Sequence, residues 1–263
     1  MRVVWLDGAI VDPAGAALSI DDPAVRWGEG LLETMRAEDG RVALLERHLE
    51  RLHRSAEVLG LEVPGPEPIR AAVQTALGAA PAGPLRVRLC ATPRPTLLVE
   101  VAPEPAITAE VPRASAVALA GTWIPANRIA EHKTLSYAAH RWSQRRAAAA
   151  GADHALLLDD DHRLGEAAIA SVFCVVAGEL WTAPARGLLA GVARAVVMGA
   201  MEVREEAPGE DAWRAADEII LTNSVRGAIA VTGVDGTPVG DGSPGPVSRR
   251  IHAALAGAMT RAD

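Results

Sequence analysis

Apolar residues recur at helical spacing in several segments of the chain and predict its helices. Residues 41–61 place apolar side chains along one face of a helix that ends near a glycine, and the proline-rich stretch at residues 64–68 breaks it. A second helix is expected over residues 69–79. Further helices are expected over residues 135–150, after Gly191, and over residues 248–259.

Short apolar runs bounded by turn residues predict the strands. Residues 1–12 are expected to form two strands joined by a turn at Asp7 and Gly8. The other strands are expected at residues 85–90, 95–101, 114–120, 155–159, 171–176, 179–182, 218–222 and 229–234. This mixture of helices and strands predicts an α+β fold in two parts, with the exit from the first part over residues 103–112.

Composition and charge exclude several classes of function. With a net charge of −7 and no block of basic residues, the chain is not expected to bind nucleic acid. It has no apolar run of membrane-spanning length and no signal-peptide pattern, so we expect a cytoplasmic protein without a membrane span. Cys90 and Cys174 lie in apolar runs, which favours buried thiols over a disulfide. The histidines lack metal-binding spacing, so no metal site is expected.

Lys133 stands out because lysine is otherwise absent from the chain. It is the only lysine among the 26 lysine and arginine residues. Surface lysine can become arginine at little cost, because both side chains stay charged in water. Arginine cannot replace lysine where a neutral amine must attack a carbonyl carbon, since a guanidinium group essentially never deprotonates. Lys133 is therefore a candidate nucleophile, with the chance survival of one lysine as the alternative.

Two further residues suit the chemistry of a lysine that carries pyridoxal phosphate (PLP). Tyr137 is the only tyrosine and would share a helix face with Lys133 if a helix begins near residue 133. The alternative for Tyr137 is an ordinary half-buried helix residue. Glu166 follows a turn and a strand, and a carboxylate beside the pyridine nitrogen would keep that nitrogen protonated. The alternative for Glu166 is a surface charge.

Three segments could hold a phosphate group. Gly191 lies among small residues before a predicted helix, where backbone N–H groups are available. Asn223 and Ser224 offer side-chain donors after a strand, and Arg51 offers a cation on the first predicted helix. Each has a structural alternative, since Gly191 suits a plain turn and Arg51 suits a solvated helix face.

The ordered motifs of the chain resemble those of the class IV aminotransferase family, the fold-type IV PLP enzymes. The matching segments are residues 26–36, 46–56, 132–137, 151–159 leading into Glu166, 189–194 and 221–227. The resemblance implies a two-domain α+β fold like that of D-amino-acid aminotransferases, with PLP in the interdomain cleft. It implies a smaller N-terminal domain over residues 1–113, a linker and first strand over 114–125, and a larger PLP-binding domain over 126–263. It also implies a homodimer that acts on a small-molecule amino substrate.

The resemblance also implies roles for single residues. Lys133 is implied to hold PLP as a Schiff base and to act as general base or acid, with Glu166 at the pyridine nitrogen. The other implied cofactor-binding residues are Arg51, Tyr137, Gly191, Val192, Ala193, Asn223 and Ser224. Thr34 is a further catalytic candidate, and Trp27, Arg36 and Arg88 are candidates for substrate binding. For the two arginines a structural ion pair is the alternative.

The chain departs from the family pattern at three places. Trp27 stands where tyrosine or phenylalanine is usual, and Ala193 replaces the threonine of the phosphate loop. Ala170 and Ser171 replace the usual Ser-Asn pair after the glutamate. We therefore expect backbone N–H groups alone to serve the phosphate at Ala193, and weaker binding of that phosphate.

Two reactions share this set of residues. One reaction is that of an aminodeoxychorismate lyase, which releases pyruvate and gives 4-aminobenzoate for folate biosynthesis. Three features favour it, namely the Glu33-Thr34 pair, the lyase-like motif over residues 221–227 and the short turn at Arg94. The alternative is an aminotransferase acting on branched-chain or D-amino acids. A non-catalytic PLP-fold protein is a third hypothesis, because of the changes at Ala193 and Ser171.

Overall fold

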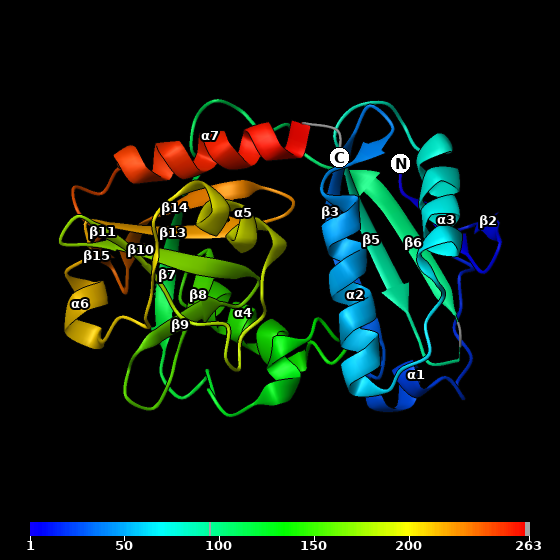
Figure 1. Cartoon of the computed structure of the whole chain (residues 1–263), viewed down its shortest axis with the longest axis horizontal. Coiled ribbons are helices and arrows are strands. Elements are labelled where there is room, and N and C mark those ends of the chain that lie inside the picture. Colours follow the sequence, from blue (N-terminus) through cyan, green and yellow to red (C-terminus); the bar gives the residue numbers. More distant parts are fainter. Residues whose placement is uncertain (95, 261–263) are drawn as a thin grey trace. The chain divides into compact units, whose positions relative to one another are not determined.

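The computed structural model describes residues 1–94 and 96–260, which form two compact units (Figure 1). The first unit holds Met1–Ala106 and Lys133–Tyr137, together with Met259 and Thr260. The second unit holds Ile107–His132 and Ala138–Ala258. The Lys133 segment belongs to the first unit because it is hydrogen-bonded there. The expected domain division at residues 113 and 126 stays a prediction.

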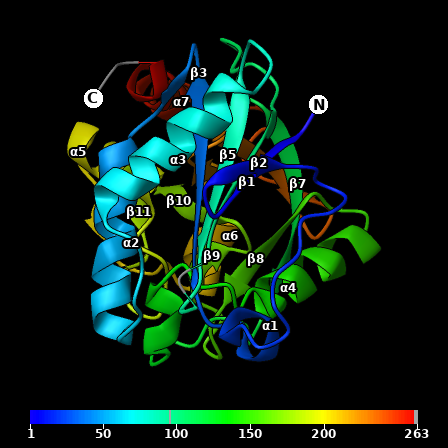
Figure 2. The same cartoon turned by 90° about the vertical axis from the view of Figure 1, so that its right-hand side faces the viewer.

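The first unit is an antiparallel sheet with two helices packed on it. Its elements are β1 (Val3–Leu6), β2 (Ala9–Val11), α1 (Pro23–Trp27), β3 (Leu31–Glu38), β4 (Arg41–Val42), α2 (Leu45–Leu59), α3 (Pro66–Gly78), β5 (Leu85–Ala91) and β6 (Leu97–Pro103). The strand order is β2-β1-β6-β5-β3-β4. Alternate residues of β5, such as Val87 and Leu89, join the apolar faces of α2 and α3 in one core. Figure 2 shows these two helices over the sheet.

The second unit is built around a larger sheet. Its elements are β7 (Arg113–Leu119), the 3₁₀ helix η1 (Arg128–Glu131), α4 (Ala138–Ala149), β8 (His154–Leu158), β9 (Leu164–Ala167), β10 (Ala170–Val176), β11 (Glu179–Thr182), α5 (Val192–Ala200), β12 (Arg204–Glu205), α6 (Glu210–Arg214), β13 (Glu218–Asn223), β14 (Gly227–Val234), β15 (Thr237–Pro238) and α7 (Pro246–Thr260). The strand order is β12-β11-β10-β13-β14-β7-β8-β9, and β15 pairs with β14. Because β9 also pairs with β10, the strands from β10 to β9 form a closed circuit around an apolar core.

A bulge in β9 decides which face of the sheet Glu166 occupies. Leu158 pairs with Leu164, but Leu157 pairs with Glu166, so Gly165 is the extra residue. A Cβ atom at Gly165 would lie 2.6 Å from the Trp123 ring, so only glycine fits beneath that side chain. Leu164 and Ala167 therefore face the apolar core. Glu166 faces the opposite side of the sheet.

Most expected elements are confirmed, with shifts at their ends. The helix expected over residues 41–61 begins at Leu45, because residues 41–42 pair with β3 as β4. The helix expected over residues 69–79 begins at Pro66, since proline is well tolerated in the first turn. The strand expected over residues 114–120 is confirmed as β7, which pairs with both β14 and β8 inside the second sheet. Pro95, the expected start of β6, lies outside the described residues.

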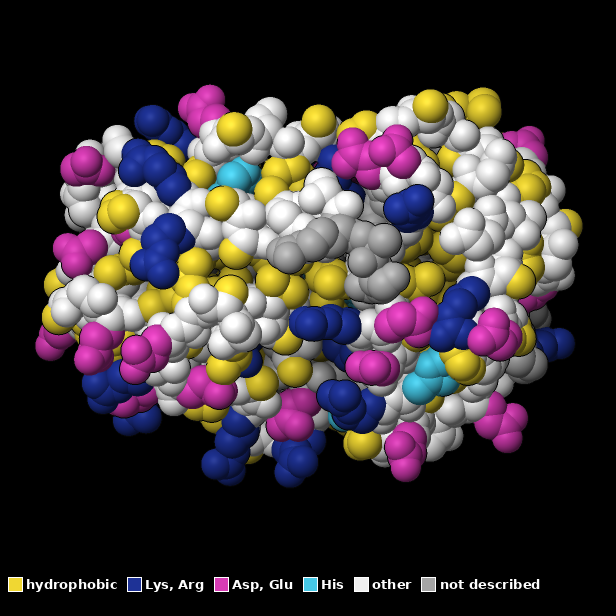
Figure 3. Space-filling model, turned by 45° about the horizontal axis from the view of Figure 1, so that its top comes forward, with side chains coloured by type: hydrophobic (Ala, Val, Ile, Leu, Met, Phe, Trp, Pro, Cys, Tyr) yellow, Lys and Arg dark blue, Asp and Glu magenta, His cyan; other side chains and the backbone are white. Residues whose placement is uncertain are grey.

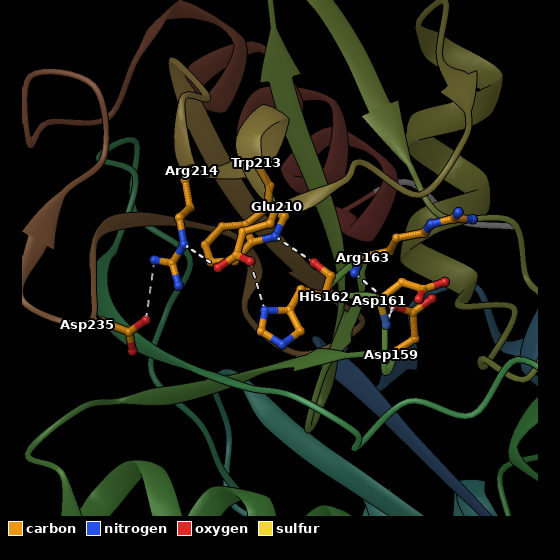
Figure 4. A network of polar contacts seen from close by, with 8 residues as sticks. All are labelled: Asp159, Asp161, His162, Arg163, Glu210, Trp213, Arg214 and Asp235. Atoms are coloured by element: carbon orange, nitrogen blue, oxygen red, sulfur yellow. Dashed lines mark hydrogen bonds and ion pairs between the residues drawn. The ribbon is translucent and has the colours of Figure 1, made fainter.

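A polar network holds the turn between β8 and β9 against α6 (Figure 4). His162 Nδ1 lies 2.8 Å from Glu210 Oε2, and the Trp213 indole donates to the His162 carbonyl at 3.0 Å. Asp159 Oδ1 accepts from the Arg163 backbone N–H at 2.8 Å. The expected turn at residues 160–162 is confirmed, and these contacts give it a structural role.

The described residues lack membrane-spanning helices, clusters of metal ligands and disulfides. None of its helices has the length and apolar character needed to cross a membrane. The described residues also contain no cluster of three metal-ligating side chains. Both cysteines are free thiols, and burial raises the pKa of Cys174 to about 12.

On the face in Figure 3, arginine side chains are interspersed with acidic ones.

Glu218 caps helix α7, and we expect its loss to destabilise the second unit. Its buried carboxylate accepts hydrogen bonds from the backbone N–H groups of Val247 at 2.9 Å and Ser248 at 2.7 Å, and from the Ser248 hydroxyl. Glu218→Ala leaves these donors without an acceptor, which is expected to lower the free energy of unfolding by about 3 kcal/mol. Urea unfolding measures this value. The exposed Glu202→Ala is the control, and equal stability of the two variants would contradict the prediction.

Candidate active site

The Lys133 segment lies alongside the start of β3. The Leu32 backbone N–H donates to the Lys133 carbonyl at 2.8 Å, and the Leu135 N–H donates to the Gly30 carbonyl at 3.0 Å. Thr134 forms a β-bridge with Leu31. Lys133 is therefore anchored by main-chain hydrogen bonds on both sides.

Lys133 and Tyr137 lie close together, although not on a helix. The helix expected over residues 135–150 begins only at Ala138, so the expected shared helix face is wrong. The Lys133 Nζ nonetheless donates to the Tyr137 hydroxyl at 3.3 Å, and it lies 5.1 Å from the centre of the ring. The backbone turns between them, since the Tyr137 N–H donates to the Leu135 carbonyl at 2.7 Å.

Gly30 lets the Lys133 segment approach β3, and we expect Gly30→Ala to displace that segment. Gly30 has φ +131°, and a Cβ there would lie 2.7 Å from the Ala91 carbonyl oxygen and 2.8 Å from Leu135 Cδ1. We expect a loss of about 3 kcal/mol in unfolding free energy from the backbone strain and the clash together.

The matched control for Gly30→Ala is Gly40→Ala. Gly40 also has a positive φ, of +74°, but a Cβ there meets nothing within 4 Å. It therefore measures backbone strain alone, at about 1 kcal/mol. Urea unfolding compares the two variants, and equal losses would show that close approach at Gly30 contributes nothing.

A buried cluster of Glu33, His48 and Arg51 joins β3 to α2. Arg51 donates from Nε to Glu33 Oε1 at 2.9 Å and from Nη2 to Oε2 at 2.6 Å. His48 Nδ1 lies 2.7 Å from Glu33 Oε2. Only 11% of the Arg51 side chain is exposed, so a solvated helix face is the wrong alternative for it. Arg51 is thus held in a fixed orientation by Glu33.

The charges of this cluster follow from burial and pairing. Burial alone would raise the pKa of Glu33, but the Arg51 charge and the His48 hydrogen bond outweigh it and lower that pKa to about 2. Burial lowers the pKa of His48 against the opposing effect of Glu33. Glu33 is therefore ionised and His48 neutral at pH 7. His48 then donates from Nδ1 to Glu33, and its buried Nε2 has no hydrogen-bond partner among residues 1–94 and 96–260.

The catalytic candidate Thr34 and the three substrate-binding candidates lie in different surroundings. Thr34 lies directly opposite Arg88 in the β3–β5 pairing, so their side chains share one face of the sheet. Arg88 is exposed. Arg36 is 2% exposed and donates from Nη1 to the Pro105 carbonyl at 3.0 Å, which favours the structural alternative for it. Trp27, at the end of α1, is 69% exposed.

Glu166 is a buried carboxylate of the second unit. The residue is 8% exposed, so the alternative of a surface charge is wrong. His140 Nε2, from α4, lies 3.9 Å from Glu166 Oε1. The strand pairings place Glu166, Ser171 and Thr222 side by side on β9, β10 and β13.

The phosphate-loop candidates surround the N-terminus of α5. Gly191 is the N-cap residue, and no side chain caps the helix there. Val192 and Ala193 are buried in its first turn. The expected helix after Gly191 is confirmed, and it presents N–H groups that suit an anion.

The loop after β13 is closed by its own side chain. Asn223 Oδ1 accepts from the backbone N–H groups of Val225 at 3.0 Å and Arg226 at 2.9 Å. The side-chain oxygen of Asn223 thus orders the loop that carries Ser224.

Sequence patterns missed Glu33 and His48 as part of the site. Both residues lie within the family motifs around Thr34 and Arg51, but the motifs gave neither of them a role in binding. The available signal was the three-residue spacing of His48 and Arg51, which places both on one side of α2. No pattern indicated that Glu33 points toward them.

Comparisons with known proteins bear on the whole chain. A family model described as Amino-transferase class IV matches residues 30–234. The chain is 28% identical over 271 residues to a putative branched-chain-amino-acid aminotransferase of Methanocaldococcus jannaschii, covering 94% of this chain and 93% of that protein. It is 36% identical over 177 residues to a bifunctional aminodeoxychorismate lyase / D-amino acid transaminase of Mycobacterium tuberculosis, covering 60% of this chain and 61% of that protein.

A solved structure agrees with these relatives. It is the PLP-bound form of a hypothetical aminotransferase from Mycobacterium tuberculosis, with a TM-score of 0.87 and 28% sequence identity. The match covers 98% of this chain and 99% of that one.

Proposed function

The chain belongs to the class IV aminotransferase family, and from this premise we propose that it is a lyase that releases pyruvate from aminodeoxychorismate. The expected family, fold type and cofactor are confirmed, and the enzyme is PLP-dependent. The cross-strand pair of Thr34 and Arg88 carries the choice of reaction. It places a hydroxyl beside a cation, and aminodeoxychorismate brings two carboxylates to be bound.

The residues of this chain fit PLP. Lys133 has an amine beside a phenol, α5 has an N-terminus that no described side chain caps, and Glu166 is a buried carboxylate. The amine suits the aldehyde of PLP, the helix N-terminus suits its phosphate, and the carboxylate suits its pyridine nitrogen. PLP supplies an electron sink, its protonated pyridine ring.

We assign the following work to the side chains. Lys133 would hold the aldehyde carbon and then carry the proton to or from the substrate's alpha carbon. Tyr137 accepts a hydrogen bond from the Lys133 amine and so orients it. Glu166 would keep the pyridine nitrogen protonated.

Binding of the charged groups is assigned to three further features. Arg51, oriented by Glu33, would bind the phosphate together with the N–H groups of Val192 and Ala193 and the Ser224 hydroxyl. Asn223 positions that hydroxyl by ordering its loop. Arg88 would bind a substrate carboxylate, and Thr34 would move a proton on the departing group.

Transamination is the second candidate, favoured by the putative branched-chain-amino-acid aminotransferase of Methanocaldococcus jannaschii, whose match covers 94% of this chain. The test supplies the purified enzyme with aminodeoxychorismate alone, and separately with branched-chain or D-amino acids plus 2-oxoglutarate. The lyase releases pyruvate without any keto-acid acceptor. Glutamate formation without acceptor-independent pyruvate release would overturn the lyase proposal, and turnover of neither type would support a non-catalytic protein.

The Thr34–Arg88 pair has its own test in this assay. Thr34→Val and Arg88→Gln should each lower pyruvate release, and Arg88→Gln should act mainly on KM because it removes a carboxylate contact. Thr75→Val, an exposed threonine on α3, is the control. Unchanged kinetics in both variants would remove the observation on which the lyase rests.

We also propose that the enzyme acts as a homodimer. Light scattering after size exclusion should give twice the chain mass of 27.4 kDa. A mass of one chain at assay concentration would contradict this.

A further inference from the structure

Three polar side chains form a row across the outer face of the second sheet. Ser171 of β10 pairs directly with Glu166 of β9 on one side and with Thr222 of β13 on the other. Directly paired residues of antiparallel strands point to the same face, with Cβ atoms about 5 Å apart. Ala170 and Val172, the neighbours of Ser171 in β10, face the apolar core instead. The row therefore lies on the opposite face from that core.

The Ser171 hydroxyl lies against the N-terminus of α5. A Cβ atom at Gly191 would lie 2.7 Å from Ser171 Oγ, so any larger residue there would displace this hydroxyl. Helix α5 packs on β13, the neighbour of β10. Its first internal hydrogen bond runs from the Ala195 N–H to the Gly191 carbonyl at 2.9 Å. The N–H groups before Ala195 thus point out of the helix beside Ser171.

Thr222 is buried with its hydroxyl unsatisfied. The residue is 2% exposed, and Oγ1 has no hydrogen-bond partner among the described residues. A buried hydroxyl without a partner is costly, so a partner is expected in the working enzyme. Ser171 is the adjacent polar side chain in the row, and rotation of the two hydroxyls can bring them within hydrogen-bond distance.

We propose that Ser171 contacts the cofactor's phosphate at the N-terminus of α5, and that Thr222 positions Ser171 by donating to its oxygen. The Ser171 hydrogen is then directed to a phosphate oxygen. This pair supplies the hydroxyl that Ala193 lacks where the family motif has threonine. The inference rests on the proposed placement of the phosphate at α5. The expectation that only backbone N–H groups are available at Ala193 itself stays a prediction.

The test measures binding of PLP and of pyridoxal, which lacks the phosphate, to apoenzyme by absorbance titration. Ser171→Ala should raise the Kd for PLP roughly tenfold to a hundredfold, because a hydrogen bond to a charged group is lost. Its Kd for pyridoxal should stay within about twofold of the wild-type value. Such a change is much smaller than the change in Kd expected from losing one hydrogen bond to the phosphate. Inorganic phosphate should compete with PLP more weakly in Ser171→Ala than in the wild type.

Variants of Thr222 test the positioning role. Thr222→Val should raise the Kd for PLP and not that for pyridoxal, whereas Thr222→Ser keeps the hydroxyl and should rescue binding. Ser243→Ala, at an exposed position, is the control. If Thr222→Val does not fold, Ser171→Ala and Thr222→Ser decide the question.

Two outcomes would overturn the inference. One is a Ser171→Ala variant that binds PLP as tightly as the wild type, and the other is an equal loss of PLP and pyridoxal. Either result leaves the proposed function intact if the wild type still binds PLP on Lys133. A wild type that does not bind PLP would instead remove both.

Discussion

Lys133→Arg is expected to lower turnover by at least about 10³-fold, because the chain has no other amine of this kind to take its place. A guanidinium group keeps the positive charge but stays protonated, so it neither bonds to an aldehyde carbon nor accepts a proton. The anchoring hydrogen bonds of residue 133 come from its backbone, so the fold should persist. Steady-state turnover of the substrate identified above measures the effect.

Two further variants separate chemistry from structure at this position. Lys133→Ala should be equally inactive, and added methylamine should restore part of its turnover by supplying the missing amine. Arg128→Ala, at a side chain that is 81% exposed, is the control. Retention of more than about a tenth of wild-type turnover in Lys133→Arg would argue against an essential amine.

Glu33→Gln is expected to lower the free energy of unfolding at pH 7 by about 3 kcal/mol. The pKa of Glu33 is about 2 in the fold, against an ordinary value of 4.5, so ionised Glu33 stabilises the folded state. Glutamine leaves the Arg51 guanidinium buried without its counter-charge, which makes the estimate a lower limit for the damage. Urea unfolding of the PLP-free protein measures it.

The sign of the pH dependence follows from the same pKa values. Because the pKa of Glu33 is lowered on folding, its stabilisation is complete above about pH 4.5 and is lost as the pH falls toward 2. Burial lowers the pKa of His48, so falling pH also destabilises the fold through His48, beginning near its ordinary value of 6.5. The difference between wild type and Glu33→Gln should therefore shrink in acid. Glu67→Gln, at an exposed residue, is the control, and a pH-independent difference would contradict this account.

Prediction from the sequence worked best for a residue whose chemistry no other residue type can supply. Lys133 was identifiable because arginine cannot do its chemistry, and the family motifs placed it in a known pattern. Its closeness to Tyr137 was also predicted, but from a helix that begins only at Ala138. The non-helical conformation of this segment was not predictable, because its hydrogen bonds go to Gly30 and Leu32, about a hundred residues away.

Strand faces were harder to predict than strands. The residues of β3 are buried on both faces of the sheet, so its sequence lacks the alternation of apolar and polar residues that marks one face as buried. The face on which the Glu33 side chain lies could therefore not be predicted. The bulge at Gly165 reverses the alternation just before Glu166, and only the position of Trp123 explains it. The Glu33–His48–Arg51 cluster and the row through Ser171 both depend on such faces, and so both required the structure.

The central claim is that one amine, on Lys133, carries the cofactor. Reduction of the PLP-loaded enzyme with borohydride, followed by peptide mass spectrometry, tests it most directly. We predict a single phosphopyridoxyl group, attached to Lys133 and absent from Lys133→Arg. Cofactor lost after reduction, or attached at any other position, would contradict the account.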